Sequence, residues 1–246
     1  MKFQSRRFRI RQRYIKEKIR QKLIFYTVII LAGGLIFSFL VFAWFAKDLP
    51  APGKLSQVSG SSSVFYDRDG KILFETYKDK NRVPVKLIEI PLDLRNATIA
   101  IEDKNFYKHK GISQTGILRA IFNIIFKRSL QGGSTITQQL IKNVLLTSQR
   151  TIPRKIKEVI LAVMVEQKYS KDQILEMYLN DSPYGGSFWG AGSAAKGYFD
   201  KSIKDLNLVE SAFLAGLPQR PNYYSPFVGR YESWRIITED VLRRMR

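Results

Sequence analysis

A long uncharged apolar segment near the N-terminus constrains this chain more than any other feature. Residues 23–46, LIFYTVIILAGGLIFSFLVFAWFA, contain no charged side chain. A helix rises about 1.5 Å per residue, so a helix of this length crosses a hydrocarbon core of about 30 Å with some tilt. The sequence therefore predicts a transmembrane helix at 23–46. The length of the stretch disfavours a cleaved signal peptide, and its basic flank disfavours a buried core helix.

The charges around this segment predict its orientation. Residues 1–22 carry ten Lys or Arg and one acid, Glu17, which gives +9 of the formal +20 and leaves +11 for the rest of the chain. Since Lys and Arg stay on the cytoplasmic side, we expect the basic tail inside the cell and the main domain outside. The remaining positive charge should then face anionic lipid head groups or a phosphorylated substrate, and nucleic acid is excluded as a partner.

The remainder of the chain divides by composition into three parts. Residues 47–63 are rich in Pro, Gly and Ser and are expected to form a linker. Residues 64–90 predict a small β region, with a hairpin turning at Asp69-Gly70 and a further strand at Val83–Ile90. From Pro91 onward apolar residues recur with helical spacing, so 91–246 is predicted to be one mainly α domain.

Several helices can be placed within that domain. A polar helix start is expected at Thr135, and a helix with proline in its first turn at 153–168. Ser170 and Gln173 have the spacing of a capping box, and 206–217 predicts a further short helix. The apolar stretch 118–126 has basic flanks, so it is either a core helix or a helix lying in the membrane interface.

Glu102 and Asp103 follow the apolar residues 99–101. Adjacent acids are common on solvated helix faces, but an acid that emerges from an apolar stretch is partly desolvated. Desolvation raises the pKa of a carboxyl group and suits it to proton transfer. The chain's one histidine, His109, lies close by in the sequence and is either a structural residue or a catalytic one. With no cysteine and a single histidine, neither a disulfide nor a multi-histidine metal site is predicted.

A second acid, Glu158, stands among cations. Arg150, Arg154 and Lys155 precede it, and the apolar run 159–165 follows it on the same predicted helix. Arg154 and Glu158 are spaced i, i+4 and could form an ordinary surface ion pair. Because the helix is apolar nearly all round, however, Glu158 should lie at the edge of a buried region. We therefore expect an anion-binding cleft at this position.

The segment Gly132–Asn143, GGSTITQQLIKN, enters a helix through two glycines, Ser134 and two threonines. Backbone N–H groups at a helix start carry a positive dipole end and suit phosphate. An ordinary capped helix would have the same pattern, and the Gly-Lys-Ser/Thr ending of a P-loop is missing. Two acids, a basic strip and a phosphate-attracting helix start beside a membrane are together what sugar transfer from a lipid pyrophosphate would require.

These residues resemble the peptidoglycan glycosyltransferase domain (glycosyltransferase family 51 type) of class A bifunctional penicillin-binding proteins and of monofunctional transglycosylases. The resemblance covers roughly residues 64–246. Its ordered motifs are EDKNFYKHKG at 102–111, GGSTITQQLIKN at 132–143, RKIKE at 154–158, KDQILEMYLN at 171–180 and LAGLPQRP at 214–221.

The resemblance implies a mainly α, lysozyme-like domain with two lobes, a small β element and a jaw at about 112–131 that dips into the membrane. It implies an inverting transfer that polymerises lipid II into β-1,4-linked glycan strands and releases undecaprenyl pyrophosphate. The expected place is the outer face of a bacterial inner membrane, on a single-pass anchor. The expected partners are lipid II, the growing lipid-linked glycan, the membrane, and a transpeptidase domain or other cell-wall synthesis proteins.

By the same resemblance, Glu102 would be the general base that deprotonates the 4-hydroxyl of the acceptor sugar, and Glu158 the second catalytic acid residue. Phe106 and His109 would support the site. No cofactor is required and no protein metal ligands are predicted, although Mg²⁺ or another divalent cation on the substrate pyrophosphate is compatible with the chemistry. The resemblance implies that substrate is bound by Asp103, Ser134, Thr137, Gln138, Gln139, Lys142, Arg150, Arg154, Lys155 and Tyr184.

Three other functions remain to be distinguished. A membrane-anchored lytic enzyme would share the fold and an essential glutamate, but it would not need the basic strip. A non-enzymatic module that binds anionic lipid would explain the charge but not the two acids. A hydrolase using Ser134 lacks a nucleophile-elbow sequence. The chain ends in VLRRMR, where bifunctional relatives would continue into a transpeptidase domain, and we expect no penicillin-binding site within it.

Overall fold

The computed structural model of the chain forms two units, Met1–Asp48 and Leu49–Arg246. Much of the predicted jaw and Arg150 lie outside the described residues, as do the Asp69-Gly70 turn and part of the linker. The structure describes residues 2–46, 49–57, 63–66, 68, 72–76, 81–113, 133–146, 151–229 and 232–246.

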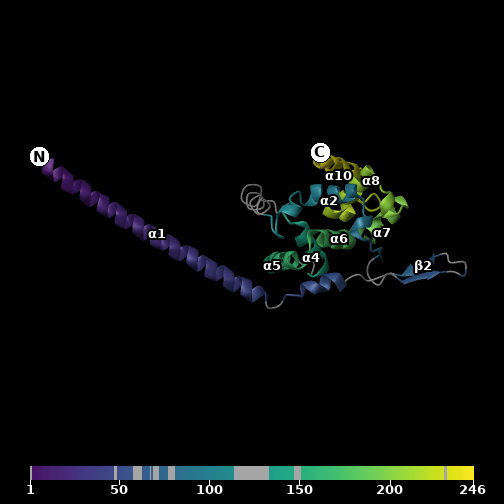
Figure 1. The fold of residues 1–246 in the computed structure, drawn as a ribbon. Helices are drawn as coiled ribbons and strands as arrows, with labels where there is room; N and C mark the ends of the chain where they lie inside the picture. The colour runs from purple at the N-terminus through teal and green to yellow at the C-terminus, as the bar shows by residue number, and fades with distance from the viewer. Residues whose placement is uncertain are drawn as a thin grey trace. The chain divides into compact units, whose positions relative to one another are not determined.

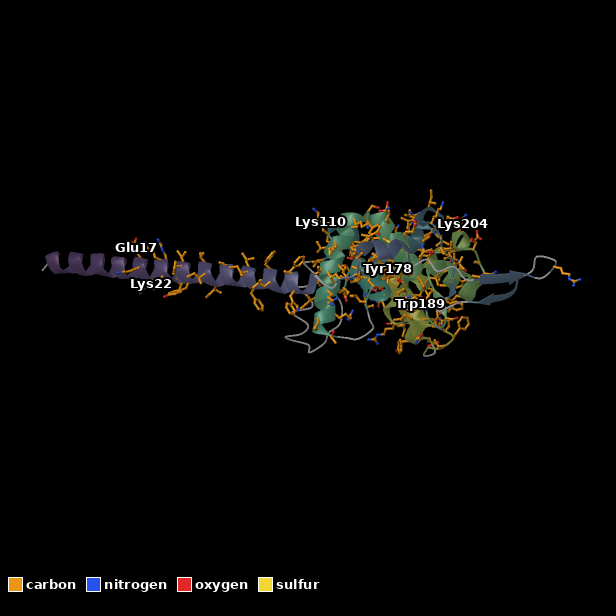
Figure 2. All side chains as sticks on the ribbon, turned by 90° about the horizontal axis from the view of Figure 1, so that it is seen from below. Glu17, Lys22, Lys110, Tyr178, Trp189 and Lys204 are labelled. Atoms are coloured by element: carbon orange, nitrogen blue, oxygen red, sulfur yellow. The ribbon has the colours of Figure 1, made fainter. Side chains whose placement is uncertain are left out.

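The N-terminal unit is one helix, α1 (Lys2–Ala46). Its stretch Glu17–Trp44 is the one helix among the described residues that is long and apolar enough to cross a membrane. The large apolar side chains described along it are exposed, and Figure 2 labels Glu17 and Lys22 at its charged start. The predicted apolar helix at 23–46 is therefore present, and its surface is the kind that hydrocarbon solvates better than water.

The second unit begins with a short 3-10 helix, η1 (Pro52–Gln57), and a small amount of β structure. Strands β1 (Ser63–Tyr66) and β2 (Ile72–Thr76) pair antiparallel, as expected for the predicted hairpin. Strand β3 (Asn81–Arg82) pairs in parallel with β4 (Phe188–Trp189), more than a hundred residues later in the chain.

The predicted strand at Val83–Ile90 is wrong. The segment contains only a 3-10 turn, η2 (Leu87–Glu89), because side chains of helix α6 (Lys171–Asp181) occupy its backbone groups. Asn180 accepts a hydrogen bond from the Val85 N–H at 2.9 Å and donates one to the Val85 carbonyl at 2.8 Å. Glu176 accepts from the Leu87 N–H at 2.6 Å. With these groups satisfied by a helix, no neighbouring strand is needed.

The longer helices pack in two groups (Figure 1). Helices α2 (Leu92–Glu102), α8 (Leu208–Gly216) and α10 (Ser233–Met245) pack against one another, and α4 (Ile136–Val144) packs against α5 (Ile152–Lys168) and α6. The mainly α class with a small β element is confirmed. The shorter elements are η3 (Phe106–Lys108), α7 (Ala191–Phe199), η5 (Ile203–Asp205), η6 (Leu217–Gln219) and α9 (Pro221–Tyr224).

Local sequence signals explain where these helices begin. Thr135 caps α4 through a reciprocal pair of hydrogen bonds with Gln138, and Ser170 caps α6 in the same way with Gln173, as predicted. Leu94 and its helical neighbours on α2 form the buried face that the spacing predicts. The core contains fully buried aromatic residues such as Tyr178. Figure 2 shows Tyr178 within the unit, whereas Lys110 and Lys204 lie at its surface.

Candidate active site

Glu102 is the last residue of α2, at the point where the two helix groups meet. Gln139 of α4 donates a hydrogen bond of 2.5 Å to Oε2 of Glu102. The other oxygen, Oε1, is buried and has no hydrogen-bond partner in the described part of the chain. Burial raises the pKa of Glu102 to about 6, and it outweighs the lowering caused by Gln139 and Lys142. The carboxyl group therefore has a raised pKa and one oxygen without a hydrogen bond, and its role as the general base stays a prediction.

Asp103 has different partners from Glu102 and stabilises the turn after α2. His109 Nε2 lies 3.0 Å from Oδ1 and 2.9 Å from Oδ2 of Asp103, and the Ile136 N–H donates to Oδ2 at 3.2 Å. Phe106 is fully buried beneath this loop, with Lys171 Nζ 4.4 Å from the centre of its ring. These contacts favour the structural alternative for His109. They also bind the Asp103 carboxylate to protein groups, so its role in substrate binding stays a prediction.

Glu158 is held between two cations on α5. It is only 2% exposed, Arg154 Nη1 donates to its Oε2 at 2.9 Å, and Lys155 Nζ forms a close ion pair with its Oε1. Lys155 also donates to Ser134 Oγ at 2.8 Å and so joins α5 to the segment that leads into α4. A carboxylate this deeply buried is stable because both oxygens are charge-paired.

Lys142 connects the two acids. Burial lowers the pKa of its ammonium group, while Glu158 and Glu102 both act to raise it. One ammonium group is therefore within electrostatic reach of both carboxylates, at a site that also contains Arg154 and Lys155. The two acids and the basic strip are far apart in the sequence, but they act electrostatically on the same ammonium group.

Three predicted substrate-binding side chains face the interior. Thr137 is fully buried and donates to Glu166 Oε1 at 2.5 Å. The side chain of Gln138 is hydrogen-bonded to the backbone of Thr135 in the cap of α4. Tyr184 is fully buried too, with a hydroxyl that has no hydrogen-bond partner among the described residues. Arg150 lies outside the described residues. Substrate binding by these four residues stays a prediction.

Two residues of the site are not among the predicted site residues. Glu166 receives Thr137 and forms an ion pair of 2.7 Å with Lys171, so it ties α4 to α5 and α6. Glu166 follows Glu158 by eight residues, which places it about 80° round the helix from Glu158, so the spacing alone does not assign the two acids to one face. Tyr178, whose hydroxyl lies 3.4 Å from Gln139 Oε1, falls within the motif at 171–180, but nothing in that motif marks it as a site residue.

A match to a known protein family identifies the family of this chain. The family described as Transglycosylase matches residues 69–246, which is most of the chain. The chain belongs to the transglycosylase family. This assigns the domain to the peptidoglycan glycosyltransferase class of enzymes and confirms the family that the five motifs indicated.

Curated relatives of this transglycosylase domain are considerably longer proteins. Penicillin-binding protein 1A of Rickettsia bellii (strain RML369-C) is 41% identical over 205 residues, which are 81% of this chain and 26% of that protein. Penicillin-binding protein 1A of Clostridium tetani (strain Massachusetts / E88) is 45% identical over 192 residues, 75% of this chain and 24% of the relative. Penicillin-binding protein 1F of Bacillus subtilis (strain 168) is 40% identical over 215 residues, which are 86% of this chain and 30% of that protein. The chain spans about a quarter of the length of these relatives.

The solved structures include penicillin-binding protein 1A from Haemophilus influenzae at 2.6 Å resolution. It is 25% identical in sequence, with a TM-score of 0.42, and the match covers 76% of this chain and 18% of that one. Similarity at this TM-score carries no conclusion beyond what the family match already establishes.

One pattern in the transglycosylase domain bears on the expectation that it holds no penicillin-binding site. Ser193 and Lys196 on α7 have the bare Ser-x-x-Lys spacing, a match that the expectation overlooked. Ser193 is 2% exposed and its hydroxyl is buried, whereas Lys196 faces solvent and pairs with Asp200. The serine and the lysine are therefore turned to different environments, which does not favour an acylation site.

Replacing Gly111 with alanine is expected to destabilise the domain by about 1–3 kcal/mol. Gly111 has φ +83°, and a Cβ there would lie 2.7 Å from the Ala162 carbonyl oxygen. Its own carbonyl accepts from Thr135 Oγ1 at 2.8 Å, so the loop 103–111, α4 and α5 meet at this glycine. Thermal unfolding of the Gly111→Ala variant measures the effect. An unchanged melting temperature would contradict this tight approach.

Proposed function

We propose that this domain polymerises lipid II into β-1,4-linked glycan strands. The observation that carries the proposal is the half-buried Glu102, with its pKa raised to about 6, sharing Lys142 with the Glu158–Arg154–Lys155 cluster. A base is thereby set beside cations suited to a departing pyrophosphate. A hydrolase acting on neutral sugar would need the acid but not the cluster.

In the proposed reaction Glu102 acts through Oε1. Gln139 holds Oε2, so Oε1 is the oxygen left to accept a proton from the 4-hydroxyl of the acceptor N-acetylglucosamine. That hydroxyl oxygen attacks the anomeric carbon of the lipid-linked N-acetylmuramic acid and inverts it. The bond from this carbon to the pyrophosphate oxygen breaks, and undecaprenyl pyrophosphate leaves with the bonding electrons.

The cations of the site stabilise the leaving group. Negative charge builds up on the pyrophosphate in the transition state, and fixed positive groups in a partly water-excluded site stabilise it most effectively. Arg154 and Lys155 are fixed by Glu158, and Lys142 is within electrostatic reach of both acids. Glu158 would thus act by holding the cations in place, with Ser134 completing the set through Lys155.

A divalent cation such as Mg²⁺ belongs in this proposal as an ion carried by the substrate. Within the residues that the structure describes, no group of three or more His, Cys, Asp or Glu side chains could hold a metal ion. Both oxygens of Glu158 are paired with Arg154 and Lys155. The ligands proposed for Mg²⁺ are the pyrophosphate oxygens of the substrate, which it prefers.

The proposed location is the outer face of a bacterial inner membrane. Support comes from the apolar stretch of α1, with ten Lys or Arg in residues 1–22 before it, which favours a cytoplasmic N-terminus. Lipid II and the growing glycan would then meet the domain at the membrane surface. Because the relatives are named penicillin-binding proteins and are longer, we propose a transpeptidase domain as a partner, in the same protein or in another.

Incubating the full chain in detergent with labelled lipid II, and separating the products by size, tests the proposed function. We expect long polymer together with released undecaprenyl pyrophosphate. Shortening of added glycan strands would instead identify a lytic enzyme. The absence of both reactions, with lipid II still bound, would identify a binding module.

The rate of polymerisation should depend on pH through Glu102. A general base works only when deprotonated, so below a pKa of about 6 the rate should fall about tenfold per pH unit and above it reach a plateau. Initial rates with labelled lipid II between pH 4.5 and 8 give this profile. A rate that does not change between pH 5 and pH 7 would mean that the Glu102 carboxyl group is not the general base.

A further inference from the structure

The hydroxyl of Tyr178 is joined to Glu102 through a single glutamine. Gln139 donates from its Nε2 to Glu102 Oε2 at 2.5 Å, and Tyr178 donates to Oε1 of the same amide at 3.4 Å. Side chains of α6, α4 and α2 therefore form one line of hydrogen bonds that ends at the carboxyl group. Because Tyr178 is second in this line, its influence on Glu102 passes through Gln139.

The position of Tyr178 is fixed by the packing around it. Its side chain is fully buried, and Figure 2 shows it within the unit. Helix α6 packs against α4, which carries Gln139, and it is capped at its start by Ser170. Near its other end, Asn180 exchanges two hydrogen bonds with the backbone of Val85. The hydroxyl is thus presented to the Gln139 amide by a helix that is anchored at both ends.

The amide of Gln139 has two ends of similar shape and opposite hydrogen-bonding character. Its oxygen only accepts, and its NH₂ group only donates. With the oxygen towards Tyr178 and the NH₂ group towards Glu102, both hydrogen bonds form. If the amide were flipped, its oxygen would face the carboxylate and the Tyr178 hydroxyl would lose this acceptor. Tyr178 therefore favours the orientation that stabilises the ionised form of Glu102.

The titration behaviour of both residues agrees with this arrangement. Burial raises the pKa of Tyr178 well above its ordinary value of 10.0, and the charge of Glu102 acts in the same direction. The hydroxyl therefore keeps its proton and remains a donor over the range in which Glu102 titrates. Burial raises the pKa of Glu102 to about 6, and the hydrogen bond from Gln139 is the largest of the influences that lower it. The orientation of this amide thus bears directly on the protonation of Glu102.

We propose that Tyr178 is a positioning residue for the candidate general base, because it holds the Gln139 amide with its NH₂ group towards Glu102. The proposal rests on the proposed function, since it bears on the reaction only if Glu102 is the base. Tyr178 acts through Gln139 and takes no part in the proton transfer itself. The consequence is that Glu102 stays ionised down to a lower pH than its burial alone would allow.

Other charged or titratable groups also face the Glu102 carboxyl group, and Tyr178→Phe leaves each of them in place. Two are cations, which lower its pKa against the larger effect of burial, and one is an acid, which raises it. One is a phenol, whose own pKa is raised by burial and then by the charge of Glu102. In the same order, these groups are Lys142 of α4 and Arg244 of α10, Asp103 at the end of α2, and Tyr184.

Tyr178→Phe removes the hydroxyl and keeps the ring that fills the core. Without its partner, the Gln139 amide can turn its oxygen to the protonated carboxyl group, so the acid limb of the rate profile should move up by about 0.5–1 pH unit. Polymerisation should then fall about twofold to fivefold at pH 6 and stay close to wild type at pH 8.5. The ratio of the two rates does not depend on the amount of folded protein. A loss by the same factor at both pH values would indicate a merely structural role and overturn the proposal.

The titration of Glu102 can also be followed without turnover. The full chain in detergent is labelled with carbon-13 at the glutamate side-chain carboxyl, and the Glu102 resonance is assigned by its absence in Glu102→Gln. We expect this resonance to titrate at higher pH in Tyr178→Phe than in wild type. In a Gln139→Ala background there is no amide to hold, so Tyr178→Phe should cause no further change. The same titration midpoint in wild type and Tyr178→Phe, or an undiminished effect in the Gln139→Ala background, would overturn the proposal.

Tyr169→Phe is the matched control. The Tyr169 hydroxyl donates at 3.3 Å to a neutral acceptor, the carbonyl oxygen of Pro52, so its loss should leave the rate profile and the titration of Glu102 as in wild type. An inactive wild-type chain in which Tyr178→Phe still moves the Glu102 titration would contradict the proposed polymerisation but leave the role of Tyr178 standing. A wild type that polymerises lipid II, with no such movement in Tyr178→Phe, would contradict the role of Tyr178 alone.

Discussion

Glu102→Gln should lower the rate of polymerisation by about a hundredfold to ten-thousandfold, the range typical of losing a general base. Glutamine keeps the size and planar shape of the side chain but cannot take up a proton. Gln139 can still pair with the new amide, because its own amide group can present either its oxygen or its N–H₂. The geometry around α2 and α4 should therefore survive while the chemistry is lost.

The same substitution should stabilise the folded domain at neutral pH. The Glu102 carboxyl titrates at its ordinary pKa of 4.5 in the unfolded chain and at about 6 in the folded one. Below pH 4.5 it is protonated in both states and burial carries no charge penalty. As the pH rises from 4.5 to 6, the folded state loses stability, and above pH 6 the full penalty of about 2 kcal/mol applies. Glutamine carries no charge and so avoids it.

Thermal unfolding of wild type and Glu102→Gln at pH 8 and at pH 4 measures this difference. We expect the variant to melt about 4 °C higher at pH 8 and at the same temperature as wild type at pH 4. Glu239→Gln, an exposed acid on α10, is the matched control and should change neither activity nor stability. Near-normal polymerisation by Glu102→Gln would remove this residue from its role as base. A much lower melting temperature of Glu102→Gln would mean that the variant is inactive because it is misfolded.

The sequence predicted best those features that depend on near neighbours in the chain. The buried face of α2, the caps at Thr135 and Ser170, and the position of Glu102 at a helix end all follow from residues within one or two helical turns. The hairpin of β1 and β2 is local in the same sense. Such features are set by backbone and side-chain contacts that any fold containing the segment would keep.

Contacts over long distances in the sequence could not be predicted in this way. Val83–Ile90 has the composition of a strand, yet its partner is the side chain of Asn180, about a hundred residues away. The helix α7, Ala191–Phe199, is built of small residues and has no clear apolar period. The pairing of Asp103 with His109 instead of substrate depends on the loop closing over Phe106. Tertiary packing decides each of these cases.

Glu158→Gln should lower the rate of polymerisation by about tenfold to a hundredfold, less than the loss at Glu102. Glu158 is 2% exposed, and both its oxygens are paired with Arg154 and Lys155. In a neutral amide one of the two acceptor oxygens is replaced by an NH₂ donor, so one cation loses its acceptor and the two positive charges stay close together without a counterion. The cations should move apart, and their stabilisation of the departing pyrophosphate should weaken.

The form of the loss distinguishes this positioning role from proton transfer. If Glu158 fixes the cations, Glu158→Gln lowers kcat while the acid limb of the pH profile stays at a pKa near 6, because Glu102 still sets it. Glu158→Asp should recover part of the activity, since a carboxylate can again pair with both cations at somewhat longer range. Disappearance of the acid limb in Glu158→Gln would instead make Glu158 the proton acceptor. Glu102 would then be left with a secondary role, because a single carboxylate controls that limb.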